Sequence, residues 1–94
     1  MKENLQQRAE KYRGLTEQAL KEIKLAEALC KEDKKIAEDF LRITRDYFND
    51  GCYYLRKGDF VTAIASFSYA HAWLDAGIRA GLFFATNERL FILP

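Results

Sequence analysis

The sequence predicts an all-α protein, an antiparallel three-helix bundle with long helices and an extended apolar C-terminal tail. Strong helix breakers are sparse, since the one proline is Pro94 and only five glycines occur in 94 residues. Apolar residues recur every three or four positions through three long segments. The polar stretches KEDKK and KGD separate those segments. We expect a single helical domain over residues 1–94, with helices at about 3–30, 34–57 and 59–80 and the tail at 82–94.

The first predicted helix follows a regular apolar series, with Lys, Glu and Gln on the opposite side. The series steps by four and three residues through Leu5, Ala9, Tyr12, Thr16, Ala19, Ile23, Ala26 and Cys30. It predicts one amphipathic helix of about seven turns. The period pauses at KEDKK, where the carboxylate of Asp33 is a suitable N-cap for a second helix.

The second predicted helix carries two adjacent apolar seams, so it should contact two neighbours. One seam includes Ile36, Phe40 and Tyr47, and the other includes Ala37, Leu41 and Phe48. After it, Gly58 offers the left-handed residue that ends a helix, and Asp59 offers an oxygen to cap the next one. These two residues are the predicted structural turn.

The third predicted helix has one seam through Phe60, Phe67, His71 and Leu74 and a second seam with small residues that permit close approach to the second helix. The tail LFFATNERLFILP has no helical period. Its two apolar clusters must be covered, because soluble monomers rarely expose so many large side chains. We expect the tail to be extended and docked, either on its own bundle or across a homodimer.

Composition excludes several classes of partner. The chain has 15 basic and 14 acidic side chains and a formal charge of +1, which argues against a strong general attraction to nucleic acid or anionic lipid. No apolar run approaches the ~20 residues of a membrane span, and the polar start lacks the apolar core of a secretion signal. We therefore expect no membrane association and a cytoplasmic location. Cys30 and Cys52 are too few and too far apart for a zinc knuckle and are predicted to be inert core thiols.

The segment RDYFNDGCYYLRKGDFVTAIASFSYAHAWLDAG, followed by the apolar tail, resembles the archaeal family known as domain of unknown function 357. The signature lies in GDF at 58–60 and in YAHAWLDAG at 69–77. The resemblance covers almost the whole chain. It implies a small helical, cytoplasmic, archaeal protein, and it implies no activity, catalytic residue or cofactor.

The candidate site is an aromatic groove on the second and third helices. It is formed by Tyr47, Tyr54, Tyr69, His71, Trp73 and Asp75. No catalytic set, phosphate loop or metal signature is present, so we predict no catalytic residue, no cofactor and no metal. His71 lies on an apolar seam, which favours one buried hydrogen bond to Asp75, a tyrosine hydroxyl or a backbone carbonyl.

Three functions are compatible with these residues. The favoured one is a non-catalytic protein-interaction or scaffolding module that binds a partner protein or a second copy. The alternative is an RNA- or nucleotide-associated domain, because nucleotide-binding helical domains have a similar tyrosine-rich end before Gly-Asp-aromatic. Its basic strip, Arg42, Arg45, Arg56 and Lys57, is interspersed with Glu38, Asp39, Asp46 and Asp50. The weakest is a metal-dependent enzyme in which His71 and Asp75 meet Asp46 and Asp50.

Overall fold

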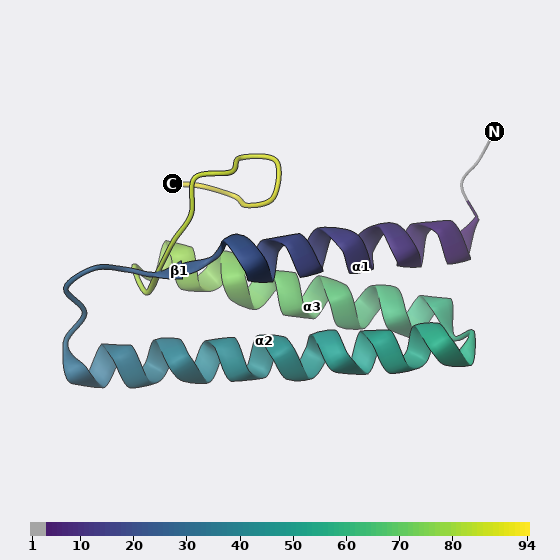
Figure 1. Cartoon of the computed structure of the whole chain (residues 1–94), viewed down its shortest axis with the longest axis horizontal. Coiled ribbons are helices and arrows are strands. Elements are labelled where there is room, and N and C mark those ends of the chain that lie inside the picture. Colours follow the sequence, from purple (N-terminus) through teal and green to yellow (C-terminus); the bar gives the residue numbers. More distant parts are fainter. Residues whose placement is uncertain (1–3) are drawn as a thin grey trace.

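A computed structural model describes residues 4–94 and shows an all-helical architecture with one small strand pair. Within those residues the elements are α1 (Leu5–Glu22), β1 (Lys24–Leu25), α2 (Lys31–Lys57), α3 (Phe60–Arg79) and β2 (Phe83–Phe84). The three helices run antiparallel to their sequence neighbours, so the predicted fold class is confirmed (Figure 1). The bundle is elongated and measures 46 × 24 × 16 Å.

Helix α1 is shorter than its apolar series predicts. Its start is fixed by a capping box, in which the Asn4 side chain accepts a hydrogen bond from the Gln7 backbone and the Gln7 side chain accepts one from the Asn4 backbone. The predicted start at residue 3 lies outside the described residues. The helix ends at Glu22, which corrects the predicted end at residue 30, because Ile23 adopts an extended backbone.

Residues 24–26 pair with the tail instead of continuing the helix. Lys24 lies opposite Phe84 and Leu25 opposite Phe83 in an antiparallel pair. The Ala26 N–H also donates to the carbonyl of Leu82, at 2.9 Å. The pairing satisfies backbone groups of both segments and holds the side chain of Phe83 in the core, where it is 4% exposed.

Helix α2 begins at Lys31, one turn earlier than the predicted cap at Asp33. The Sγ atom of Cys30 is the capping acceptor and receives the Asp33 backbone N–H at 3.4 Å. The other end agrees with the sequence: Gly58 has φ 81°, and the Asp59 side chain accepts from the Thr62 N–H at 3.1 Å. The predicted turn between α2 and α3 is thus confirmed.

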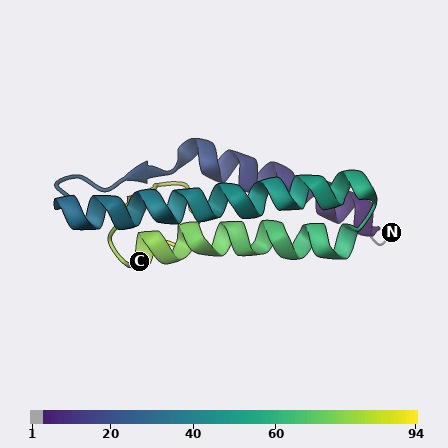
Figure 2. The ribbon, with the colours of Figure 1, turned by 90° about the horizontal axis from the view of Figure 1, so that it is seen from below.

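Helix α3 packs against both other helices, and its contact with α2 is the most extensive (Figure 2). Gly51 makes this contact close, since a Cβ atom there would lie 2.5 Å from the Phe67 ring. Phe67 is itself fully buried. The predicted tight packing of the third helix on the second is therefore present.

The core has two apolar clusters along the bundle. One lies at the end with the sheet and the tail and includes Leu74, Ile78 and Phe83, and the other lies nearer the α2–α3 turn around Phe67. The buried hydroxyls of Thr16 and Thr44 are satisfied by backbone carbonyls of Phe67 and Phe40, at 3.4 and 2.8 Å. Such pairing removes most of the cost of burying a hydroxyl.

The tail folds back on its own chain after β2. Leu90 and Phe91 are 8% and 4% exposed and belong to the same cluster as Leu74 and Ile78. Asn87 bonds to Glu22 of α1 at 3.2 Å, and its carbonyl accepts from the backbone of Leu90. The tail thus covers the β2 end of α1 and α3. Across the described residues, no helix is both long and apolar enough to traverse a lipid bilayer.

Candidate functional site

The predicted groove residues lie on different sides of α3 and do not form one groove. Tyr47, Tyr69 and Trp73 gather where α3 meets α2, whereas His71 and Asp75 face the tail. Tyr54 packs beside the second core cluster and meets the Tyr53 ring. Successive α-helical residues turn by about 100°. Tyr69 and His71, two positions apart, consequently point to opposite flanks.

The α2 side of α3 carries an aromatic surface. The rings of Tyr47 and Tyr69 lie 5.5 Å apart, and Trp73 meets Phe40 edge-on at 4.8 Å. A shallow hollow of about 240 Å³ is lined by Tyr69, Ala72, Trp73 and Ala76. Tyr69 is 60% exposed, so much of this surface is open to solvent.

The tail side of α3 is an anchor. The Nε2–H of His71 donates to the Leu90 carbonyl, and the imidazole lies 5.8 Å from the Phe91 ring. One turn later, Asp75 accepts the Ile92 backbone N–H at 3.0 Å. His71 therefore makes the predicted hydrogen bond, with a backbone carbonyl as its partner. Both side chains are used to hold the tail.

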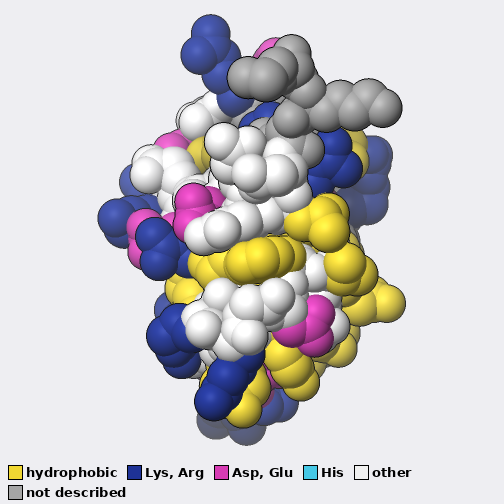
Figure 3. Space-filling view, turned by 90° about the vertical axis from the view of Figure 1, so that its right-hand side faces the viewer, with side chains coloured by type: hydrophobic (Ala, Val, Ile, Leu, Met, Phe, Trp, Pro, Cys, Tyr) yellow, Lys and Arg dark blue, Asp and Glu magenta, His cyan; other side chains and the backbone are white. Residues whose placement is uncertain are grey.

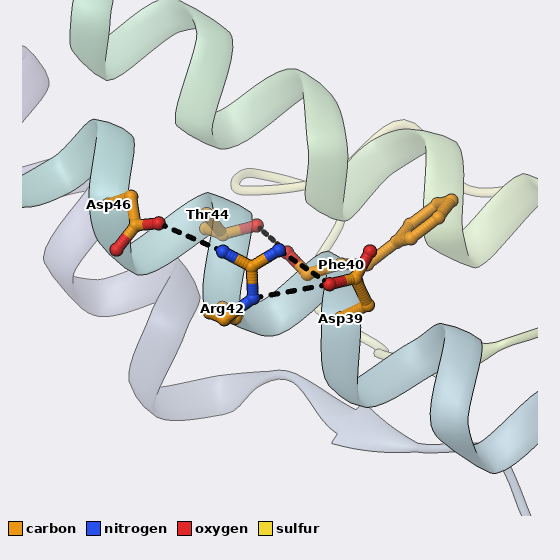
Figure 4. A network of polar contacts seen from close by, with 5 residues as sticks. All are labelled: Asp39, Phe40, Arg42, Thr44 and Asp46. Atoms are coloured by element: carbon orange, nitrogen blue, oxygen red, sulfur yellow. Dashed lines mark hydrogen bonds and ion pairs between the residues drawn. The ribbon is translucent and has the colours of Figure 1, made fainter.

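Two of the three carboxylates proposed for a metal site, Asp46 and Asp75, are engaged elsewhere. Arg42 bonds to Asp39 at 2.6 Å and to Asp46 at 3.3 Å along the exposed surface of α2 (Figure 4). The hydrogen bond that Arg42 donates to the Asp39 carboxylate raises the pKa of Arg42, and the negative charges of Asp39 and Asp46 act in the same direction. Within residues 4–94, no three His, Cys, Asp or Glu side chains converge as metal ligands do. The geometry does not bring His71 and Asp75 together with Asp46 and Asp50 into such a group.

Cys52 does not have the surroundings of a nucleophile. Cys52 is partly buried, and this burial raises the pKa of its thiol, although the positive charges of Arg13 and Arg56 lower it in part. A thiol with a raised pKa remains protonated and unreactive at neutral pH. Cys30 is exposed, which corrects its prediction as a core thiol, and it serves as the cap of α2.

An uncharged surface along α3 was missed by the sequence analysis. We call it the α3 outer face. All six of its side chains are exposed and none carries a charge: Val61, Ala65, Ser68, Tyr69, Ala72 and Ala76. The signal was present, because no Lys, Arg, Asp or Glu occurs between residues 60 and 74. The small residues predicted to pack on α2, Ala63, Ala70 and Gly77, are buried, whereas Ala65, Ala72 and Ala76 are exposed.

The other helices expose charged surfaces. Glu10, Lys11 and Arg13 are exposed on α1, and Glu38, Arg42 and Arg45 on α2. The end of the bundle where α1 begins and α2 turns into α3 is mixed: Figure 3 shows hydrophobic side chains at the surface among Lys and Arg. Val61, at this end, is 63% exposed. The α3 outer face thus continues to the end of the bundle.

Comparison with known proteins identifies the family. The sequence model for a protein of unknown function, DUF357, matches residues 11–83. The chain belongs to the DUF357 family. The crystal structure of a DUF357 protein from Archaeoglobus fulgidus is similar, with a TM-score of 0.69 and 30% sequence identity over 87% of this chain and 93% of that one. No curated protein matches the sequence. Membership in DUF357 agrees with the resemblance seen in GDF and YAHAWLDAG and assigns no activity.

Proposed function

We propose that this protein is a non-catalytic interaction module that binds another protein through the α3 outer face. One observation carries the proposal: six exposed side chains over about four turns of α3 include no charge. A helix that is apolar on all sides is normally buried. A contiguous apolar surface on a small soluble protein marks an interaction site.

The chemistry of the surface favours a helical protein partner. Alanines at positions 65, 72 and 76 leave room for another backbone to approach, while Tyr69 and Trp73 beside them supply large rings. Aromatic residues contribute strongly at protein interfaces because they bury a large area at a low cost in conformational entropy. Phosphate recognition, in contrast, needs basic side chains, and this face has none.

We infer a scaffolding role in the cytoplasm of an archaeon. The similar crystal structure is that of an archaeal protein, which supports an archaeal origin for this chain. The two cysteines are not joined in a disulfide, as is usual in reducing compartments. We infer that the protein holds its partner in place and performs no chemistry itself.

Affinity capture tests the proposal. The tagged protein and its Ala72→Arg variant are incubated with a lysate of the organism that encodes the chain, and retained protein and RNA are both identified by mass spectrometry and sequencing. Asn49→Arg is the matched control, since Asn49 is exposed on α2 and the change adds the same charge. We expect a protein retained by the wild type and the control and lost with Ala72→Arg. Retention of RNA alone, or equal retention by all three, would overturn the proposal.

A further inference from the structure

We propose that the partner on the α3 outer face is a second copy of this chain, and that the two α3 helices pack antiparallel about a twofold axis. This inference rests on the proposed function and names its partner. In a twofold interface the same patch occurs on both sides, so the patch must be complementary to itself. An uncharged patch meets that requirement without each charge needing an opposite charge on the second copy.

The α3 outer face satisfies the requirement without charges, whereas the exposed surfaces of α1 and α2 would have to pair each charge with an opposite one. None of the six residues of the face is charged, so pairing two copies places no like charges in contact there. The face combines a projecting ring, Tyr69, with a hollow between Tyr69 and Ala76. Because the projecting ring and the hollow lie on one patch, the Tyr69 ring of each copy can enter the hollow of the other copy.

An antiparallel register fits the spacing of the small residues. When Ala65 lies opposite Ala72 of the second copy, the same register sets Val61 opposite Ala76. At the centre of the crossing the same register sets the large ring of Tyr69 opposite Ser68 of the second copy, with the Ala–Ala and Val–Ala pairs on either side, so the interaxial distance lies within the usual ~8–10 Å. The two helix dipoles also run in opposite directions, which is the favourable arrangement for neighbouring helices.

The charges at the ends of α3 favour the same register. Asp59 precedes the first residue of α3, and Arg79 is its last. Antiparallel pairing with Ala65 opposite Ala72 brings Arg79 of each copy to the end that carries Asp59 of the other. Opposite charges at the rim of an interface fix its register and orientation. A parallel pair would instead place Arg79 beside Arg79.

The available area sets the expected strength. A 20-residue helix is about 30 Å long, and a strip one helix diameter (~10 Å) wide along it covers roughly 300 Å² per copy. This is below the size of stable specific interfaces and in the range of weak, transient ones. We therefore expect a dimer that dissociates on dilution.

Sedimentation equilibrium of the full chain tests the dimer. The mass of the wild type should rise with concentration from that of the 10.9 kDa monomer towards twice that value. Ala72→Arg should remain monomeric with an unchanged helical circular dichroism spectrum, and Asn49→Arg should behave as the wild type does. A wild type that stays monomeric up to millimolar concentration, or an Ala72→Arg protein that dimerises equally well, would overturn the inference.

Cysteine cross-linking tests the orientation. In a background with Cys30→Ser and Cys52→Ala, the pair Ala65→Cys and Ala72→Cys in one chain should form a covalent dimer under mild oxidation. Ala65→Cys alone should not, because the antiparallel register separates the two copies of position 65 by about seven residues, or ~10 Å. Efficient cross-linking through position 65 alone would show a parallel pair and overturn the register.

The end charges give an independent readout. Arg79→Glu should raise the dissociation constant about three-fold or more, as expected for a rim ion pair replaced by a repulsion. Asp59→Asn should weaken the dimer while keeping an oxygen to cap α3. If neither change alters the dissociation constant, Arg79 and Asp59 do not meet, and the register is overturned.

Failure of this inference is distinguishable from failure of the proposed function. A monomeric wild type that captures a different protein in an Ala72-dependent manner overturns the dimer and leaves the module. A monomeric wild type that captures no protein overturns both.

Discussion

Gly58, between α2 and α3, has a backbone conformation that favours glycine. Its φ of 81° lies in the left-handed region, and a Cβ atom there meets nothing within 4 Å. Any cost of adding a side chain therefore comes from the backbone alone. Gly14, inside α1, has equally open surroundings and an ordinary helical backbone.

These two glycines predict opposite effects of one substitution. Gly58→Ala should lower the free energy of unfolding by ~1–2 kcal/mol, the cost of a left-handed L-residue. Gly14→Ala should raise it by ~0.5–1 kcal/mol, because alanine restricts the unfolded chain and favours helix. Urea unfolding of both variants measures the difference. Equal effects of the same sign would contradict the assigned role of Gly58.

His71 predicts a structural phenotype. His71→Phe keeps a ring against Phe91 and removes the donor to the Leu90 carbonyl, so it should cost ~1 kcal/mol of stability. His71→Gln retains a side-chain N–H and should cost less. Thermal unfolding, with amide hydrogen exchange at Phe91 and Ile92, measures the loss and locates it in the tail. Release of a stoichiometric metal by either change would contradict a purely structural histidine.

At the scale of elements, Gly51 controls how closely α2 and α3 pack. Gly51→Ala places a methyl group about 2.5 Å from the Phe67 ring, which is fully buried and has little room to move. Overpacking of this kind costs ~1–3 kcal/mol, more than the gain in helix propensity. Adding Phe67→Leu should make the cost of Gly51→Ala smaller, since it removes the clashing ring. Additive effects in this double-mutant cycle would show that the two residues do not interact.

Elements whose sequence patterns are local could be predicted, and elements that depend on residues far along the chain could not. The helical periods and the Gly58–Asp59 turn are local, and they were predicted correctly. Strand β1 was not, because Ile23 and Ala26 fit the helical series and the pairing depends on Phe83 and Phe84, far along the chain. The cap at Cys30 was missed because sulfur is a weak acceptor and Asp33 is the commoner choice.

The sequence predicted which residue types the candidate site contains, but not how those residues are arranged. The aromatic residues of α2 and α3 were found, but helix geometry separates Tyr69 from His71. The partner of His71 was the main-chain carbonyl of Leu90, which no side-chain pattern identifies. The α3 outer face was missed because alanine is common both in close helix contacts and on exposed helix surfaces.

For the whole molecule, the tail closes one end of the bundle. Ending the chain at Phe84 removes Leu90 and Phe91 from the core, and each is worth up to ~1.5–3 kcal/mol. We expect a lower melting temperature and an unchanged association constant, because the tail lies on its own bundle and the α3 outer face remains. Calorimetry and sedimentation measure these two properties. A loss of dimer with unchanged stability would mean that the tail reaches the second copy.

The pairing of β1 with β2 joins two segments that lie on either side of α2 and α3 in the sequence, whereas α2 and α3 are neighbours connected by a tight turn. Contacts between distant segments require the closure of a long loop, and they slow folding more than local contacts do. The α2–α3 hairpin is therefore expected to form in the transition state, with the strand pair and tail closing after the barrier. Stopped-flow refolding should show that Gly51→Ala mainly slows folding and that removal of residues 85–94 mainly speeds unfolding. If Gly51→Ala instead mainly speeds unfolding and the truncation mainly slows folding, the strand pair and the tail form in the transition state. The tail would then guide folding as well as cover the core.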